Sequence, residues 1–144
     1  MEIGLFDVAL RNSQDFDHWS RLARHGTRLS YQRQVLLKYR CRPDGLTGDT
    51  GNCLRRELRM FDKVEQSYDL TPTERVEVAA VIRDRRALLE FEMGKDHLVQ
   101  GQFSLASDSF ARAHEQRPSM KKLAALWLSR LAPGLMRTIC LRRM

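Results

Sequence analysis

The chain has 144 residues, of which 42% are hydrophobic and 30% are charged. This balance excludes an intrinsically disordered chain, and the length suits one domain or slightly more. The longest apolar run, Leu123–Leu128, is far too short to span a bilayer, and the N-terminus lacks the pattern of a signal peptide. Cys41, Cys53 and Cys140 form no Cys-x-x-Cys pair, which favours reduced thiols. We therefore expect a cytoplasmic protein.

The net charge of +7 is concentrated at the C-terminal end. Seven basic residues and no acidic residue lie between Arg117 and Met144, whereas the other 18 basic residues are balanced by 18 acidic ones. A basic surface can bind nucleic acid, but such binding usually also needs stacking aromatic side chains or a known module. Trp127 alone meets that need in this segment, so nucleic acid is not the expected partner.

A short helix is predicted near the N-terminus. Ser13 is a suitable N-cap, and the carboxylates of Asp15 and Asp17 would lie in the first turn, where they complement the helix dipole. His25-Gly26 is typical of a helix end. The apolar residues that recur at helical spacing in between are Phe16, Trp19 and Leu22 or Ala23.

Extended structure is predicted near residues 28–40, as one bent strand or two short ones. Apolar side chains there fall on alternate positions, with mostly polar residues between them. Residues 42–52 are rich in glycine and contain Pro43, which indicates a loop. We place the boundary between residues 1–50 and 51–144 in this loop. The alternating apolar residues are Leu29, Tyr31, Val35, Leu37 and Tyr39.

Helical periodicity dominates after the loop. Apolar residues from Leu54 to Tyr68 predict a helix of about four turns. Thr71-Pro72-Thr73-Glu74 then combines an N-cap, a proline at the first helical position and a capping-box glutamate. The helix that starts there is expected to continue to about Gln100.

A second series of spaced residues lies within residues 88–118: Gly94, His97, Gly101, Ala106, Phe110, Ala113 and Pro118. Their spacing resembles a tetratricopeptide repeat, a helical hairpin with a period of about 34 residues. The match departs from the usual pattern at Glu90, where tryptophan is common, and at His97, where tyrosine is common. A single repeat cannot bury its own apolar face, so a further helix at Met120–Leu131, ending near Pro133-Gly134, is expected to cover it.

One ordered series of residues runs through the first third of the chain: Phe6-Asp7, Asp15, Asp17, Trp19, Arg21-Leu22, Gly26, Tyr31, Val35-Leu36 and Tyr39-Arg40. This series resembles the end of the catalytic domain of family 2 glycosyltransferases, which have a GT-A fold. The resemblance implies that residues 1–50 are a remnant of that domain and that residues 51–144 are a helical extension. The expected fold is therefore mainly α, with one small β element.

The resemblance implies transfer of a sugar from a nucleotide-sugar donor to a glycan or lipid-linked acceptor. Asp15 takes the position of the general base, which removes a proton from the acceptor hydroxyl. Asp17, Trp19, Arg40 and Arg42 take positions near the substrate. Each also has an ordinary explanation: first-turn acids for the two aspartates, packing for Trp19, and strand-end charges for the two arginines.

The residues of a nucleotide-binding half are not found in this sequence. A divalent cation and a nucleotide sugar are therefore implied only for a longer parent, and this chain alone is expected to be inactive and to hold no metal or cofactor. Asp15-Phe16-Asp17 spells Asp-x-Asp, but it would open a helix instead of following a nucleotide-binding strand, so it does not predict a metal site.

A binding function is the alternative to an enzymatic one. The hairpin at residues 88–118 could hold a partner protein in a groove. The tail from Lys121 to Met144 alternates apolar and basic residues, which fits either packing on the hairpin or contact with an anionic membrane surface. The second of these would place the protein at the inner surface of the membrane.

Overall fold

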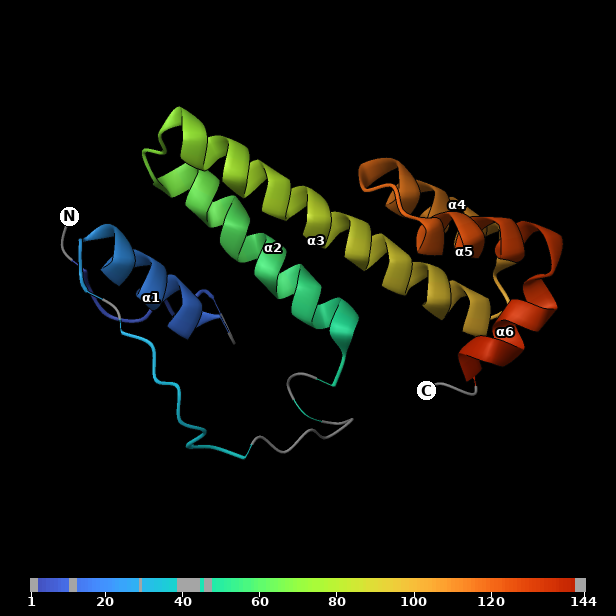
Figure 1. The fold of residues 1–144 in the computed structure, drawn as a ribbon, viewed down its shortest axis with the longest axis horizontal. Helices are drawn as coiled ribbons and strands as arrows, with labels where there is room; N and C mark the ends of the chain where they lie inside the picture. The colour runs from blue at the N-terminus through green and yellow to red at the C-terminus, as the bar shows by residue number, and fades with distance from the viewer. Residues whose placement is uncertain (1–2, 11–12, 29, 39–44, 46–47, 142–144) are drawn as a thin grey trace. The chain divides into compact units, whose positions relative to one another are not determined.

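The computed structural model describes residues 3–10, 13–28, 30–38, 45 and 48–141. These residues form helices and no strand, so the prediction of a mainly α fold is confirmed. The chain divides into two compact units, Met1–Met60 and Phe61–Met144, which meet inside a helix. The boundary expected near residue 50 falls at the start of that helix. The helices are α1 (Gln14–Arg24), α2 (Thr50–Ser67), α3 (Pro72–Val99), α4 (Phe103–Gln116), α5 (Met120–Leu131) and α6 (Pro133–Leu141) (Figure 1).

Helix α1 of the N-terminal unit begins and ends where the sequence predicts. Ser13 is the N-cap residue, although its side chain makes no capping hydrogen bond. At the other end, the His25 and Gly26 N–H groups donate to carbonyls of the last turn, and Gly26 adopts a φ of 81°. Glycine reaches this left-handed region without the steric cost that a Cβ atom brings, so the chain can leave the helix there.

The extended element predicted near residues 28–40 is not a strand in the part that the structure describes. Residues 28 and 30–38 have no regular structure, and the side chains of Tyr31, Val35 and Leu37 are largely exposed. Alternation alone does not make a strand, because the backbone N–H and C=O groups need a neighbouring strand as partner. Leu29 and Tyr39 lie outside the described residues.

Helix α3 starts at the predicted capping box. The Glu74 N–H donates to Thr71 Oγ1 at 3.3 Å, and the Thr71 N–H donates to the Glu74 carboxylate at 2.8 Å. Pro72 occupies the first helical position, where its missing N–H costs nothing. The helix then runs for 28 residues to Val99, as the sequence pattern predicts.

Helices α3 and α4 form a tight hairpin in the C-terminal unit. Gly101, with a φ of 78°, permits the turn between them. The Phe110 side chain is fully buried, and the position where a Cβ atom of Gly94 would lie is only 2.7 Å from its ring. The absence of a side chain at Gly94 therefore lets the ring of Phe110 lie directly against helix α3.

The last two helices complete the packing of this hairpin. Helix α5 packs on α4, and α6 packs on α5 and on the C-terminal end of α3 (Figure 1). Helix α5 stops before Pro133 as predicted, and Pro133 then opens α6. The resulting core contains Phe91, Leu98, Ala106, Phe110, Ala113, Ala125 and Met136.

Candidate functional site

Asp15 is exposed in the first turn of α1. Its Oδ1 accepts a hydrogen bond of 2.8 Å from the N–H of Phe16. Trp19 lies one turn further along the helix, and 58% of its surface is exposed. Residues four apart share one side of a helix, so Asp15 and Trp19 lie on the same exposed face of α1.

Asp17 is not part of that exposed face. Only 2% of its surface is exposed, and its Oδ2 accepts a hydrogen bond of 3.0 Å from Nε of Arg21. Arg21 also donates through Nη2 to the carbonyl of Leu5 at 2.8 Å. This network holds the segment before the helix against α1, so the contacts of Asp17 are structural ones. The spacing of four residues between Asp17 and Arg21 is the sequence signal for this ion pair.

Arg40 and Arg42 lie outside the described residues, as does Cys41. Cys53 Sγ accepts a hydrogen bond of 3.1 Å from Nη2 of Arg56, and Cys140 packs against the core of the C-terminal unit. Among the described residues, no group of three or more His, Cys, Asp or Glu side chains is placed to hold a metal ion. Within the same part of the chain, no helix is both long and apolar enough to cross a membrane.

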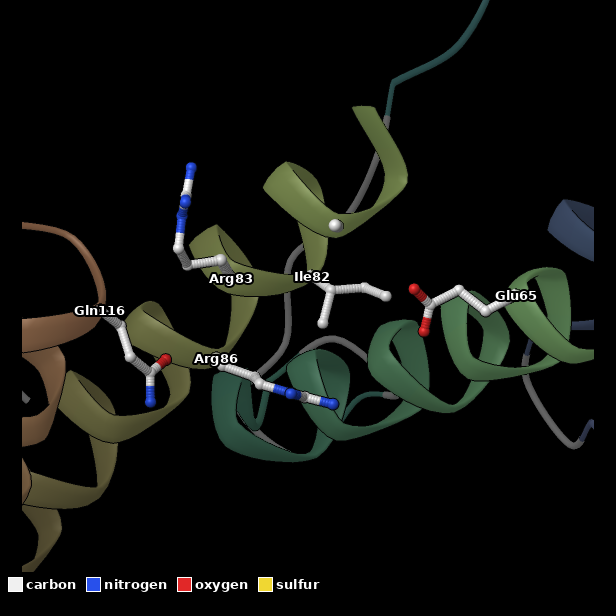
Figure 2. A pocket seen from close by; sticks show the side chains of 6 residues that line it. Glu65, Ile82, Arg83, Arg86 and Gln116 are labelled. Carbon is white, nitrogen blue, oxygen red and sulfur yellow. The ribbon is translucent and has the colours of Figure 1, made fainter. Parts of the chain in front are cut away.

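A pocket of about 320 Å³ lies in the C-terminal unit, where the end of α2 and the end of α4 approach α3. Ile82 on α3 gives it an apolar wall, and this side chain is almost fully buried. Polar groups arise from all three helices, as Figure 2 shows. The lining residues are Glu65, Ala79, Ile82, Arg83, Arg86 and Gln116.

The polar groups of the pocket are only partly used by the protein itself. Arg86 forms a long ion pair of 3.8 Å with Asp62. The exposed side chain of Arg83 points away from Glu65, Arg86 and Gln116 (Figure 2), so its guanidinium group lies at the edge of the pocket. Gln116 Oε1 is buried and has no hydrogen-bond donor in that part of the chain. A buried acceptor without a donor costs about 1–3 kcal/mol, so a rotation of the Gln116 side chain that turns Oε1 toward a ligand N–H in the pocket would recover this energy.

The pocket therefore offers one hydrogen-bond acceptor, one carboxylate, two guanidinium groups and an apolar wall. This set can bind and orient a ligand that has an N–H group and a negative charge. No local sequence pattern predicts this pocket, because its lining residues come from three helices and no local spacing links Glu65 or Gln116 to the arginines of α3.

The charged groups near the start of α5 form a second polar region. Burial lowers the pKa of Lys122, and the nearby positive charges of Arg117 and Lys121 lower it further. Lys122 Nζ donates to the carbonyl of Arg117 at 2.8 Å, and the Arg117 side chain forms an ion pair with Asp84. Positive charge is therefore concentrated here, and one carboxylate compensates only part of it.

Comparison of the chain with protein-family models, with curated proteins and with solved structures finds no match.

Proposed function

We propose that the C-terminal unit is a helical protein-interaction module that holds a peptide segment of a partner protein in the pocket between α2, α3 and α4. The observation that carries this proposal is that Gln116, whose buried Oε1 has no donor among the described residues, lines the pocket together with Glu65 and Arg86. A peptide backbone supplies the N–H group that this oxygen lacks.

The remaining groups of the pocket fit the same ligand. An acidic side chain or a terminal carboxylate of the peptide would pair with the guanidinium of Arg83, and charge-assisted hydrogen bonds of this kind are the stronger ones. An apolar side chain would pack on Ile82. The resemblance of residues 88–118 to a tetratricopeptide repeat supports this function, since such helical hairpins serve as protein-binding surfaces.

A peptide selection tests the proposal. Peptides selected from a random displayed library on the immobilised chain are synthesised, and their affinities are measured for the wild type and for Arg83→Glu and Gln116→Leu variants. Loss of a hydrogen bond to a charged group costs about 1.5–3 kcal/mol, so the Arg83→Glu variant should bind at least about tenfold more weakly.

Two controls separate binding from folding. Arg59→Glu reverses an exposed charge outside the pocket and should leave peptide affinity unchanged. Gln116→Leu removes an unsatisfied buried oxygen, so it should weaken peptide binding without lowering the free energy of unfolding. Selected peptides that bind all these variants equally, or a selection that enriches no peptide, would contradict the proposal.

We propose as a second function that residues 1–50 derive from the acceptor side of a family 2 glycosyltransferase, with Asp15 at the position of the general base. The supporting observation is the apolar surface that the N-terminal unit exposes, including Trp19, Tyr31 and Val35. In a GT-A domain, a sheet would supply hydrogen-bond partners to residues 28–40 and cover their apolar side chains.

The intact mass of the native protein tests this second proposal. An antibody against α5 and α6 would isolate the protein from its own cells for mass spectrometry. A species much larger than 16.8 kDa would support a parent enzyme, and Asp15→Asn should then abolish its sugar transfer. A species of 16.8 kDa that transfers no sugar would leave this proposal without support.

A further inference from the structure

The solvent side of α5 is unusually apolar. Met120, Trp127 and Leu131 are 79%, 53% and 77% exposed, and Ala124 and Leu128 are exposed beside them. At 3.6 residues per turn, these five positions fall on one side of the helix. These five exposed residues form the α5 stripe.

The protein core does not account for the α5 stripe. Helix α5 faces the core with the opposite side, through Ala125, Leu126 and the buried Ser129. Helix α6 repeats this arrangement, because Met136 and Cys140 contact the core while Leu135 and Ile139, one turn apart, are exposed. Contiguous exposed apolar surface of this kind marks an interaction site more often than a chance feature.

The charged side chains that α5 and α6 themselves carry are all basic. The sequence has no acidic residue from Gln116 to Met144. Lys121, Arg130 and Arg137 contact neutral groups: Lys121 lies over the ring of Phe91, Arg130 donates to Ser107 Oγ, and Arg137 donates to the carbonyl of Val99. These contacts leave the charge of the three side chains uncompensated, whereas Arg117, before the start of α5, pairs with Asp84.

We propose that α5 and α6 dock the protein on an anionic membrane surface, with the α5 stripe inserted between the lipid headgroups. A helix that carries tryptophan and leucine on one side and is bordered by lysine and arginine has the composition of an interfacial helix. Helix α5 has 12 residues, too few to span a bilayer but enough to lie in the interface.

Charge complementarity favours a membrane over the other two occupants of this surface. A second copy of the chain would bring Lys121 and Arg130 close to the same residues of its partner, where like charges repel. A partner helix that pairs through a heptad seam usually faces flanking residues of both signs, whereas α5 and α6 have basic residues alone. An anionic leaflet supplies many mobile negative charges together with an apolar interior.

Flotation with lipid vesicles tests this proposal with the full chain. The Trp19→Phe variant leaves Trp127 as the only tryptophan, so its emission reports on the α5 stripe alone. We expect the chain to float with mixed phosphatidylcholine–phosphatidylglycerol vesicles and not with pure phosphatidylcholine. The emission of Trp127 should shift to shorter wavelength on binding, and binding should weaken as salt rises from about 0.01 M to about 1 M.

Substitutions at exposed positions identify the surface responsible. Leu131→Glu places a charge in the α5 stripe and should lower the vesicle partition coefficient by about tenfold or more. Val76→Glu, at an exposed apolar position on α3, is the matched control and should leave it unchanged. Both positions are solvent-exposed, so circular dichroism should show equal helix content.

Three results would overturn the proposal. These are absence of flotation with the anionic vesicles at low salt, an unchanged Trp127 emission, and equal losses for Leu131→Glu and Val76→Glu. If the chain does not bind vesicles but dimerises or binds a protein through Leu131, this surface is a protein-binding surface and the membrane proposal is wrong. The peptide pocket is a separate surface, so the Arg83→Glu variant should bind vesicles like the wild type, and either proposal can fail alone.

Discussion

Gly94→Ala should destabilise the α3–α4 hairpin, although alanine is a better helix former than glycine. The added Cβ atom would meet three ring atoms of Phe110 at 2.7, 2.9 and 2.9 Å, whereas ordinary contact begins at 3.4 Å. The ring or the helix must therefore move by about 0.7 Å, and Phe110 is fully buried and also packs against Phe91. Overpacking of this kind costs about 1–3 kcal/mol, and the helix propensity of alanine returns about 1 kcal/mol.

Gly134→Ala isolates the packing contribution to this change. Gly134 also lies in a helix, but a Cβ atom there would have nothing within 4 Å. Alanine should therefore stabilise this site slightly, and the two variants should differ by about 1–3 kcal/mol in free energy of unfolding. Urea titration followed by Trp127 fluorescence in the Trp19→Phe background measures this difference.

A second variant checks the cause. Gly94→Ala combined with Phe110→Leu replaces the ring by a smaller side chain, so the two substitutions should be non-additive, with a coupling of about 0.5–3 kcal/mol. If Gly94→Ala is as stable as Gly134→Ala, the close approach of Phe110 to helix α3 does not exist and the account of this hairpin is wrong.

Three further substitutions test other parts of the fold. Thr71→Ala removes the capping box with Glu74 and should cost about 0.5–2 kcal/mol in free energy of unfolding; an unchanged urea midpoint would argue against the cap. Asp17→Ala leaves Arg21 without its buried carboxylate, so amide hydrogen exchange should accelerate in α1 and not in α4. Equal acceleration in both helices would refute this local role. Leu98→Ala creates a cavity in the core and should cost about 2–5 kcal/mol by urea titration, and a cost near zero would contradict its complete burial.

The parts of the fold that the sequence predicted depend on local chemistry. The capping box at Thr71 and Glu74 needs only residues three apart, and Gly101 needs only its own backbone freedom. Ala106 and Ala113 belong to the repeat pattern at residues 88–118, and both small side chains are fully buried in the hairpin. Such local features do not depend on how the helices pack on one another, and they could therefore be predicted from the sequence.

The features that the sequence did not predict depend on distant partners. The alternating residues at 28–40 would be a strand only beside another strand, and the described ones have none. The pocket depends on how the ends of α2 and α4 approach α3, which no local pattern encodes. The resemblance placed Asp17 near a substrate. Its spacing from Arg21 fits an ion pair, but its burial also depends on the contact of Arg21 with the distant carbonyl of Leu5.

The C-terminal tail shows both kinds of feature. The sequence shows its helical spacing and its purely basic charge. This pattern fits either packing on the hairpin or contact with a membrane. The structure assigns Ala125, Leu126 and Met136 to the core, and it leaves Trp127 and Leu131 in solvent. The prediction that the tail packs on the hairpin is therefore confirmed. The exposed residues are available for the membrane contact that we propose.

Photo-crosslinking in the cells that make the protein tests whether the pocket between α2, α3 and α4 binds a partner protein. A photoreactive phenylalanine at Ala79, which lines the pocket, is compared with the same group at Ser104, an exposed position on α4 outside it. The account predicts a discrete protein adduct from position 79, which is absent from position 104 and is lost when Arg83→Glu is added. Identical adducts from both positions, or an adduct from position 79 that persists with Arg83→Glu, would contradict a peptide-binding pocket.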